Sequence, residues 1–490
     1  MTAATRQAPT VDSAAASAAL DAAITRVVDS GNCSGCGACA LLDSGIEMRR
    51  NAEGYFRPVR VAPAPAPAST AEGRVVATAA PAQPATSRPS ATVPVPVPVP
   101  VPVTEATTPT ETRVDPAAVA RFEAACPGVT VSAARPAAAR RHPTMGPVVR
   151  AWKAWATDSE TRHRGSSGGA LSAIAAWMLE TGQSARMVGA TADPAEPRRT
   201  VSVTIMSRDQ AIAAAGSRYA PTPSAAQPAA VQNGSLFVGK PCEASAVRSL
   251  IATRSTADAD LPGSDPVILS FFCAGTPSQH ATDALVTSLG IPSDEPLKDL
   301  WYRGRGWPGR FTAVRRDGSQ ADASYEESWG STLGPAVQWR CKVCADGVGE
   351  SADITAADFW QSDSQGYPVF AEGAGRSALI ARTERGYDIV LRAVEAGVIS
   401  VTPMEVDDLA AVQPLQTTRR STLAGRLLGA RLAGGRVPKY RGFGLTLLAV
   451  PRLRETIRMA RGTFRRRRAA ASTPTIPAAP ATDPDGRATS

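Results

Sequence analysis

Short apolar runs and amphipathic stretches alternate through residues 144–413. Three of the apolar runs are too short for helices and predict buried strands. They lie at residues 236–238, 267–272 and 377–382. Amphipathic spacing at 167–180 and 384–396 predicts helices. Strands that alternate with helices are typical of helices packed on a sheet, so the pattern predicts a mixed α/β domain over residues 144–413.

A smaller module is predicted on the N-terminal side, in two pieces. Residues 45–59 alternate around a Gly-containing turn, which predicts a β-hairpin, and a helix is predicted to end at Cys126. Between them, residues 61–113 are rich in Pro, Ala and Val. Because Pro lacks the N–H that a sheet needs, they predict a polyproline-II-like or disordered insertion. The module itself is predicted to comprise residues 29–60 and 114–143.

Charge is distributed very unevenly along the chain. Residues 1–28 and 471–490 are predicted to be disordered, and residues 414–470 to form a basic helical extension. From residue 415 to 470, fifteen Arg and Lys accompany one acid, Glu455, a balance of +14 in a chain whose total is +9. The rest of the chain is therefore net negative, and the basic character belongs to the extension.

The basic segment at residues 415–468 favours contact with an anionic membrane surface or docking to an acidic partner. A solvated helix that covers the core is the structural alternative. Nucleic acid is not expected as a partner, because no aromatic residues interleave with the basic ones.

The sequence shows no continuous run of 18 apolar residues and no apolar core of a secretory signal. We therefore expect a cytoplasmic protein, with peripheral contact at the inner face of the membrane as an option. Thiols in the cytoplasm stay reduced, so clustered cysteines there are more often metal ligands than disulfides.

Eight cysteines give the strongest chemical signal. Cys33, Cys36 and Cys39 have the spacing C-x2-C-x2-C, and a remote Cys126 is followed by Pro. Bacterial ferredoxins ligate 4Fe–4S clusters with cysteines in this arrangement, because a cubane needs four thiolates at tetrahedral corners. The pattern predicts a ferredoxin-like 4Fe–4S module. A structural zinc site, which usually has two paired knuckles, and unliganded thiols are the alternatives.

The other four cysteines lie in the larger domain. Cys242 and Cys273 each follow a predicted strand, and Cys341 and Cys344 form a C-x2-C knuckle beside Asp346. Four thiols at loop ends of one domain predict a second metal centre, which is either an iron–sulfur cluster or a zinc site. The alternative without a metal is that Cys242 and Cys273 are small buried residues.

The order of short motifs along the chain resembles the beta-subunit family of coenzyme F420 hydrogenases and dehydrogenases, over residues 30–60 and 115–400. The matching segments are C-x2-C-x2-C at 33–39, RGSSGG at 164–169, GSRY at 216–219, VGKPC at 238–242, FCAG at 272–275, RGRG at 303–306, RC-x2-C-x-D at 340–346, ADI at 352–354 and D-x-W at 358–360. Glu243 departs from the family's usual Gln and Ala357 from its usual Gly, and the Pro-rich insertion is unusual.

The resemblance implies an iron–sulfur flavoprotein with FAD, at least one 4Fe–4S cluster and, in many members, hydride exchange with coenzyme F420. The Gly-Ser segment at 165–169 opens a predicted helix, whose N-terminus favours an anion such as the FAD pyrophosphate. The residues expected to contact the flavin are Arg164, Ser166, Ser167, Gly168, Gly169, Ser217, Arg218, Tyr219 and Lys240. The alternatives are plain N-capping by Ser166 or Ser167 and an ordinary turn at 216–219.

The same Gly-Ser segment matches the G-x-S-x-G elbow of hydrolases, but that elbow follows a buried strand and residues 158–164 are polar. The leading hypothesis is an oxidoreductase that moves electrons between a hydride carrier such as coenzyme F420 and 4Fe–4S clusters through FAD. It would serve a redox partner protein or a small-molecule acceptor. A non-catalytic electron-transfer subunit and a zinc-stapled scaffold without redox activity are the alternatives.

Overall fold

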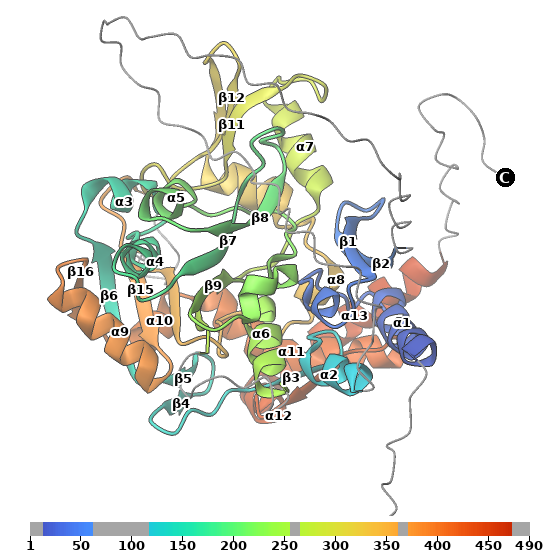
Figure 1. Cartoon of the computed structure of the whole chain (residues 1–490). Coiled ribbons are helices and arrows are strands. Elements are labelled where there is room, and N and C mark those ends of the chain that lie inside the picture. The colour runs from blue at the N-terminus through green and yellow to red at the C-terminus, as the bar shows by residue number, and fades with distance from the viewer. Residues whose placement is uncertain (1–12, 62–116, 255–264, 361–370, 473–490) are drawn as a thin grey trace, which may run out of the picture.

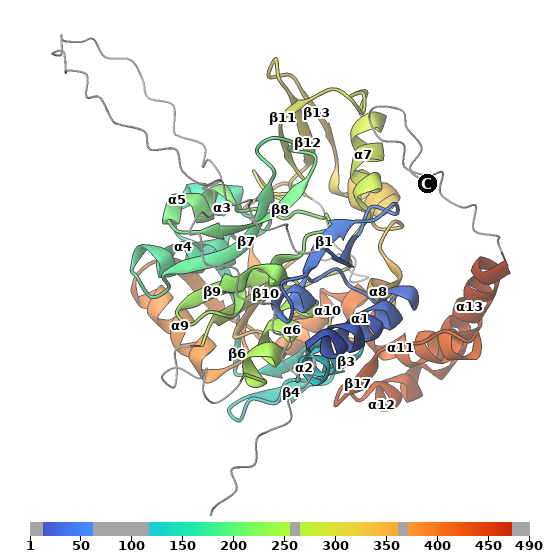
Figure 2. The same ribbon diagram turned by 45° about the vertical axis from the view of Figure 1, so that its right-hand side comes forward.

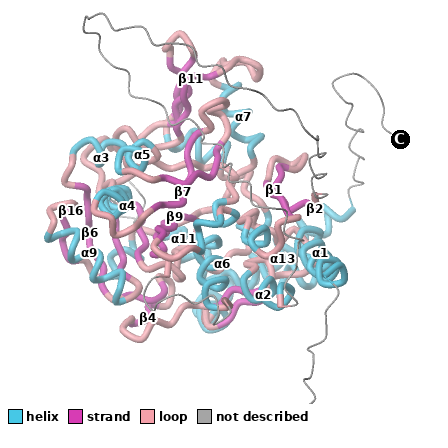
Figure 3. The backbone as a smooth tube through the Cα atoms, in the orientation of Figure 1, coloured by secondary structure: helices cyan, strands magenta, loops and turns pink. Residues whose placement is uncertain are grey.

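A mixed eight-stranded sheet forms the centre of the molecule (Figures 1 and 3), in a computed structural model that describes residues 13–61, 117–254, 265–360 and 371–472. In spatial order the strands are β16 (Ile399–Pro403), β6 (Arg150–Ala156), β15 (Ser377–Ala381), β14 (Ile354–Asp358), β10 (Val267–Phe271), β9 (Ser235–Gly239), β7 (Arg186–Ala192) and β8 (Thr200–Ile205). Strands β14, β10, β9 and β7 run parallel, and the strands outside them pair antiparallel. The parallel centre brings four strand ends to one edge of the sheet.

Helices cover both faces of this sheet. Leu236 and Leu269 of the central strands pack on one side, under α4 (Ala170–Glu180), α5 (Arg208–Ala213) and α9 (Glu384–Glu395). Their neighbours Phe237 and Ile268 point to the other side, where α6 (Pro241–Ala252) packs. Helix α10 (Val406–Ala411) lies at that side's end, over β15 and β6. Apolar residues therefore face both layers, as a buried parallel sheet requires, and the predicted α/β class is confirmed.

Smaller elements complete the large domain. They are β4 (Arg140–His142), β5 (Gly146–Val148), α3 (Ser159–Arg164), α7 (Gln279–Ser288), β11 (Leu297–Trp301), β12 (Phe311–Arg315), β13 (Gln320–Ala323) and α8 (Trp339–Lys342). Strands β11, β12 and β13 form their own antiparallel sheet, against which α7 packs. In the part of the chain that the structure describes, no helix is both long and apolar enough to cross a bilayer.

The N-terminal module packs beside α6. Its elements are α1 (Ser13–Asp29), β1 (Ile46–Arg50), β2 (Phe56–Arg60), α2 (Ala118–Ala125) and β3 (Thr130–Ser132). The predicted hairpin is confirmed as β1–β2, and the helix that ends before Cys126 is α2. The disorder predicted for residues 1–28 is wrong from residue 13 onward. There α1 forms because Leu20 and Ile24 bury their side chains against Phe122. The predictions for residues 1–12, 62–116 and 473–490 lie outside the described residues. The disorder predicted from residue 471 is wrong for residues 471 and 472, which continue the last helix.

The C-terminal extension is helical and folds back on the rest of the molecule. Its elements are α11 (Pro414–Leu432), β17 (Lys439–Arg441), α12 (Leu445–Ala449) and α13 (Leu453–Ser472). Strand β17 pairs in parallel with β3 of the N-terminal module, and α13 packs along α11. In Figure 2 the end of α13 projects from the body of the molecule.

Candidate functional site

The four cysteines of the predicted ferredoxin-like set meet around one cavity. Cys33, Cys36 and Cys39 lie on the loop between α1 and β1, and Cys126 caps the C-terminus of α2. All four line a cavity of about 30 Å³, together with apolar side chains from α1 and α2. Gly37 has φ +91° and a Cβ there would lie 2.7 Å from Ala226, so the loop depends on a glycine at this position. The structure thus joins cysteines that residues 62–116 separate in the sequence.

Burial dominates the acid–base behaviour of these thiols. Burial raises the pKa of Cys36 to about 11, and it raises the pKa of Cys39 well above its usual value, with neighbouring thiolates adding to the shift. The apolar wall therefore disfavours bare thiolates. A cationic metal centre in the cavity would supply the compensation that four buried thiolates need, and its binding would release their protons.

The second set of cysteines gathers at the carboxyl edge of the parallel strands. Cys242 follows β9 and Cys273 follows β10, so both lie at the ends of neighbouring strands. Cys341 and Cys344 lie at the end of α8, close to Cys273. Burial raises the pKa of Cys273 to about 12, and the charges of Cys341 and Cys344 add to this rise. The backbone N–H of Thr276 donates to Cys341 Sγ at 3.3 Å. Such donors stabilise thiolate ligands of metal clusters.

The two sets adjoin each other. Cys36 of the first set and Cys273 of the second are both close enough to Cys242 to raise its pKa, although burial is the larger cause. Between the sets lies Arg340, whose side chain is 2% exposed. Its Nε and Nη2 donate to the carbonyl oxygen of Pro127 at 3.1 and 2.8 Å, directly after Cys126.

Arg340 reaches both sets electrostatically. Burial raises the pKa of Cys33 and of Cys126, and the charge of Arg340 opposes that rise in both. On the other side, Cys344 hydrogen-bonds to the guanidinium. Burial alone would lower the pKa of Arg340, but Tyr440, Cys344 and Cys242 raise it above its usual range. One buried cation therefore interacts with two candidate ligands of each set, Cys33 and Cys126 of the first and Cys242 and Cys344 of the second.

Neither set has the geometry of a site for a single metal ion. Among the described residues, no group of three or more His, Cys, Asp or Glu side chains converges closely enough to hold one ion. A tetrahedral zinc site with 2.3 Å bonds places its sulfurs about 3.8 Å apart. The thiols of a 4Fe–4S site stand further apart, because the cubane lies between them.

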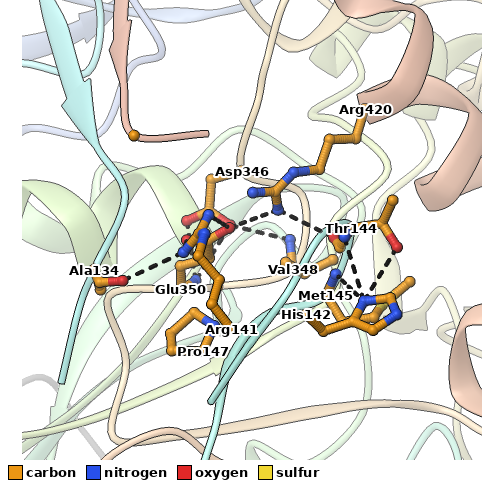
Figure 4. A network of polar contacts seen from close by, with 12 residues as sticks. Ala134, Arg141, His142, Thr144, Met145, Pro147, Asp346, Val348, Glu350 and Arg420 are labelled. Carbon is orange, nitrogen blue, oxygen red and sulfur yellow. Dashed lines mark hydrogen bonds and ion pairs between the residues drawn. The ribbon is translucent and has the colours of Figure 1, made fainter. Parts of the chain in front are cut away.

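A buried ion network anchors the loop after Cys344 (Figure 4). Glu350 pairs with Arg141 at 2.7 Å and with Arg420 at 2.5 Å. Asp346 accepts hydrogen bonds from the backbone N–H groups of Val348 and Glu350. The network fixes the backbone at Asp346, two residues beyond Cys344. Its arginines belong to β4 and α11, and its acids belong to the loop itself.

The Gly-Ser segment lies at the same sheet edge as the second cysteine set. It follows β6 and α3 and opens α4, whose N-terminus has no side-chain cap. Ser377 Oγ accepts from the N–H of Gly168 at 3.0 Å and contacts Ser167 Oγ at 2.8 Å. Ser166 Oγ is buried without a hydrogen-bond partner among the described residues. An uncapped helix end beside an unsatisfied hydroxyl suits an anionic ligand group.

The glycines of this segment also have a purely structural reason. A Cβ at Gly168 would lie 2.4 Å from the carbonyl oxygen of Ala154, and one at Gly169 would lie 2.6 Å from that of Thr161. Close backbone packing alone therefore requires glycine at both positions.

The other predicted flavin residues are more strongly engaged with protein. Arg164 pairs with Glu160 at 3.0 Å along α3. Arg218 donates to Thr200 Oγ1 and to the carbonyl oxygens of Leu300, Pro197 and Arg199. These four bonds occupy its guanidinium, so the structure speaks against the predicted contact of Arg218 with flavin phosphate or ring.

Lys240 and Tyr219 occupy different surroundings. Lys240 Nζ donates to Glu243 at 2.7 Å and to Thr222 O at 2.8 Å, near Cys242. Burial would lower its pKa, but Glu243 and then Cys242 raise it. The ring of Tyr219 packs 4.9 Å from that of Trp329, and Ser217 hydrogen-bonds to Tyr219. Lys240 therefore belongs to the second cysteine set, and Tyr219 to an aromatic cluster.

Arg303 is the centre of that cluster, and sequence reasoning assigned it no role. It is 2% exposed, pairs with Asp358 at 2.6 Å and donates to Ser166 O. Its guanidinium lies over the rings of Trp307, Tyr325 and Trp360, at 5.0 to 5.2 Å from their centroids. The sequence did contain a signal for this role. The motifs RGRG and D-x-W supply Arg303 and Asp358, the two members of the buried ion pair.

Comparison with protein-family models shows the family to which this chain belongs. Residues 151–227 match the N-terminal model of the coenzyme F420 hydrogenase/dehydrogenase beta subunit, and residues 233–407 match its C-terminal model. The chain belongs to this family. Among solved structures, a chain of the F420-reducing [NiFe] hydrogenase complex from Methanosarcina barkeri is 22% identical, covers 58% of this chain and 94% of its own length, and superposes with a TM-score of 0.45. No curated protein matches.

The family segments divide the candidate site. The Gly-Ser segment lies in the part that matches the N-terminal beta-subunit model, and the second cysteine set with Arg303 lies in the part that matches the C-terminal model. Cys33, Cys36, Cys39 and Cys126 lie outside both segments.

Proposed function

We propose that this protein is an iron–sulfur flavoprotein oxidoreductase that moves electrons between coenzyme F420 and 4Fe–4S clusters through FAD. The supporting observation is the cavity lined by Cys33, Cys36, Cys39 and Cys126, whose thiols come from two segments far apart in the sequence. Membership of a family of F420 hydrogenase and dehydrogenase subunits supports the electron-transfer class.

Each cysteine set would hold one cluster. The first has four thiols and an apolar wall, and Arg340 balances part of their negative charge. The second would use Cys242, Cys273, Cys341 and Cys344, with the Thr276 N–H bonded to Cys341. Because Cys242 is close to Cys36, the two clusters would be near neighbours and could exchange electrons directly.

FAD would bind along the carboxyl edge of the sheet. The unsatisfied Ser166 hydroxyl and the uncapped N-terminus of α4 would hold the pyrophosphate. Arg303 and its aromatic neighbours would line the adjoining region. When bound, the flavin converts a two-electron hydride transfer into single-electron steps. The residues of this chain would position it, exclude water and supply positive charge.

The site lies where ligands usually bind in open α/β sheets, outside the carboxyl ends of parallel strands. The donor or acceptor would be a deazaflavin such as coenzyme F420. The clusters would connect to a redox partner protein or a small-molecule acceptor, and we expect the protein to act in the cytoplasm.

Metal analysis of the anaerobically purified full chain tests this proposal. Two 4Fe–4S clusters correspond to about eight iron and eight acid-labile sulfide per chain. C126S should lose about half of the iron, and the matched variant C341S should lose the other half. The two variants should also lose different signals in the electron paramagnetic resonance spectrum of the reduced protein.

Zinc in place of iron would refute the redox assignment, and a C126S protein with unchanged iron would refute the first cluster. The hydride carrier is tested separately, by absorbance of the flavin-loaded protein. Reduced deazaflavin should bleach the flavin band and NADH should not. Bleaching by neither, with both clusters present, would favour a subunit that only relays electrons.

A further inference from the structure

Helix α13 carries an exposed apolar stripe that no other part of the described chain covers. Leu453, Ile457 and Phe464 are 59%, 43% and 36% exposed. Their spacing of four and then seven residues places them on one face of the helix. Just before the helix, Leu447 and Val450 are 79% and 67% exposed. Large apolar side chains thus follow one another in solvent along the end of the chain.

Packing on α11 leaves this stripe on the side of the helix, about a quarter turn from the face that contacts α11. Thr456 and Thr463 are buried on the face that packs against α11. There the carbonyl oxygens of Thr456 and Ala460 lie directly over Gly425 and Gly429, where any Cβ would clash at 2.1 and 2.2 Å. The glycines allow close packing of the two helices, which fixes the rotation of α13 about its axis.

A basic face borders the apolar stripe. Arg454, Arg458, Arg461 and Arg465 are all exposed and recur every three or four residues. From the period of the helix, their centre lies about 90° from the centre of the stripe, on the side away from α11. The one acid of the segment, Glu455, is within 3.4 Å of Arg452 and lies off this face.

Positive charges crowd one another in this region. The pKa of Arg426 is lowered by burial and by the charges of Arg419 and Arg466.

We propose that α13 docks this protein on an anionic membrane surface, with the apolar stripe in the interface and the arginines among lipid head groups. Basic helices with one apolar face bind membranes in this way. The apolar stripe decides between partners. An acidic protein or a nucleic acid would satisfy the arginines but would leave Leu453, Ile457 and Phe464 in water. Figure 2 shows that the end of α13 projects from the body, where a flat surface can reach it.

Vesicle co-sedimentation of the full-length protein tests this surface. Large unilamellar vesicles of phosphatidylcholine with 0 to about 30% phosphatidylserine serve as the probe. Binding should rise with phosphatidylserine content and fall at high salt. The double variant L453S/I457S should bind about tenfold or more weakly at every lipid composition. Replacing the four arginines by Gln should weaken binding about fivefold for each one replaced.

Leu391 on α9 is 44% exposed, and Arg316 is exposed in a turn, so L391S/R316Q is a matched control that should bind like the wild type. Retained iron content and melting temperature show that each variant is folded. Absence of binding to phosphatidylserine vesicles would overturn the proposal. Binding that survives L453S/I457S would also overturn the proposal. The protein would then adsorb through charge alone, which would favour an acidic macromolecule as the partner of the arginines.

Discussion

Arg340 offers the sharpest test of the electrostatics of the site. Replacing it by Gln removes a buried cation that contacts Cys344 and opposes the pKa rise of Cys33 and Cys126. A cluster with four thiolate ligands carries negative charge and becomes more negative when reduced. Loss of the cation should therefore lower the reduction potentials of both clusters.

The size of the effect follows from the position of the guanidinium. It hydrogen-bonds to Cys344, so the centre of the nearer cluster would lie roughly 7 Å away, and at an effective dielectric constant of about 20 a unit charge is then worth about 2.4 kcal/mol. For a one-electron couple this corresponds to roughly 100 mV. The substitution also leaves the carbonyl oxygen of Pro127 without its donor, at a cost of about 1–3 kcal/mol in stability.

Redox titration followed by electron paramagnetic resonance gives both potentials in one experiment. R340Q should shift each to a lower value, and R340K, which keeps the charge, should lie between R340Q and the wild type. Melting temperature reports the structural cost, which both variants share. Unchanged potentials in an R340Q protein that retains its iron would refute the electrostatic role. A shift of one potential alone would show that the guanidinium serves a single cluster.

Three further substitutions follow from the fold. G37A should prevent the cysteine loop from closing and lower the iron content, because its Cβ would clash with Ala226. The control G182A has the same left-handed backbone but open space around the new Cβ, so it should lower the free energy of unfolding by only about 1 kcal/mol. R218M should lower the melting temperature and leave flavin affinity unchanged in fluorescence titration, since four hydrogen bonds to Thr200 and to backbone carbonyls occupy the guanidinium of Arg218. D353N should lower the free energy of unfolding by about 3 kcal/mol at neutral pH. Burial raises the pKa of Asp353, but the charges of Arg248 and Arg385 outweigh burial and hold this pKa below its usual value. Chemical denaturation should therefore show that the wild type loses stability as the pH falls below about 4, whereas D353N should lose little.

The sequence predicted what local spacing controls. The cysteine triplet, the strands of the sheet and the helix before Cys126 all follow from periodicity and from Pro and Gly positions. The alignment of Cys242 with Cys273 was also accessible, because both follow strands predicted to be buried. These features depend on residues close together in the chain.

Contacts between distant segments were not accessible. Arg218 looked like a ligand for phosphate, but its partners are carbonyl groups near residues 197 and 300, which no local pattern reveals. Helix α1 was expected to be disordered, since its Ala-rich sequence gives no sign that Phe122 will cover it. Arg340 was noted only as the residue before a cysteine, and its bond to Pro127 spans more than two hundred positions.

The pairing of β17 with β3 ties the C-terminal extension to the N-terminal module. Tyr440 hydrogen-bonds to the carbonyl of Val343, between two candidate ligands, while its strand runs beside the residues that follow Cys126. A shortened protein that stops at residue 407, where the family match ends, would lose this strand and the contact of Tyr440 beside the second cysteine set. A load on the outer helix would be transmitted through this strand to the loop that carries Cys341 and Cys344, so attachment at a surface would be coupled to the geometry of the proposed second cluster.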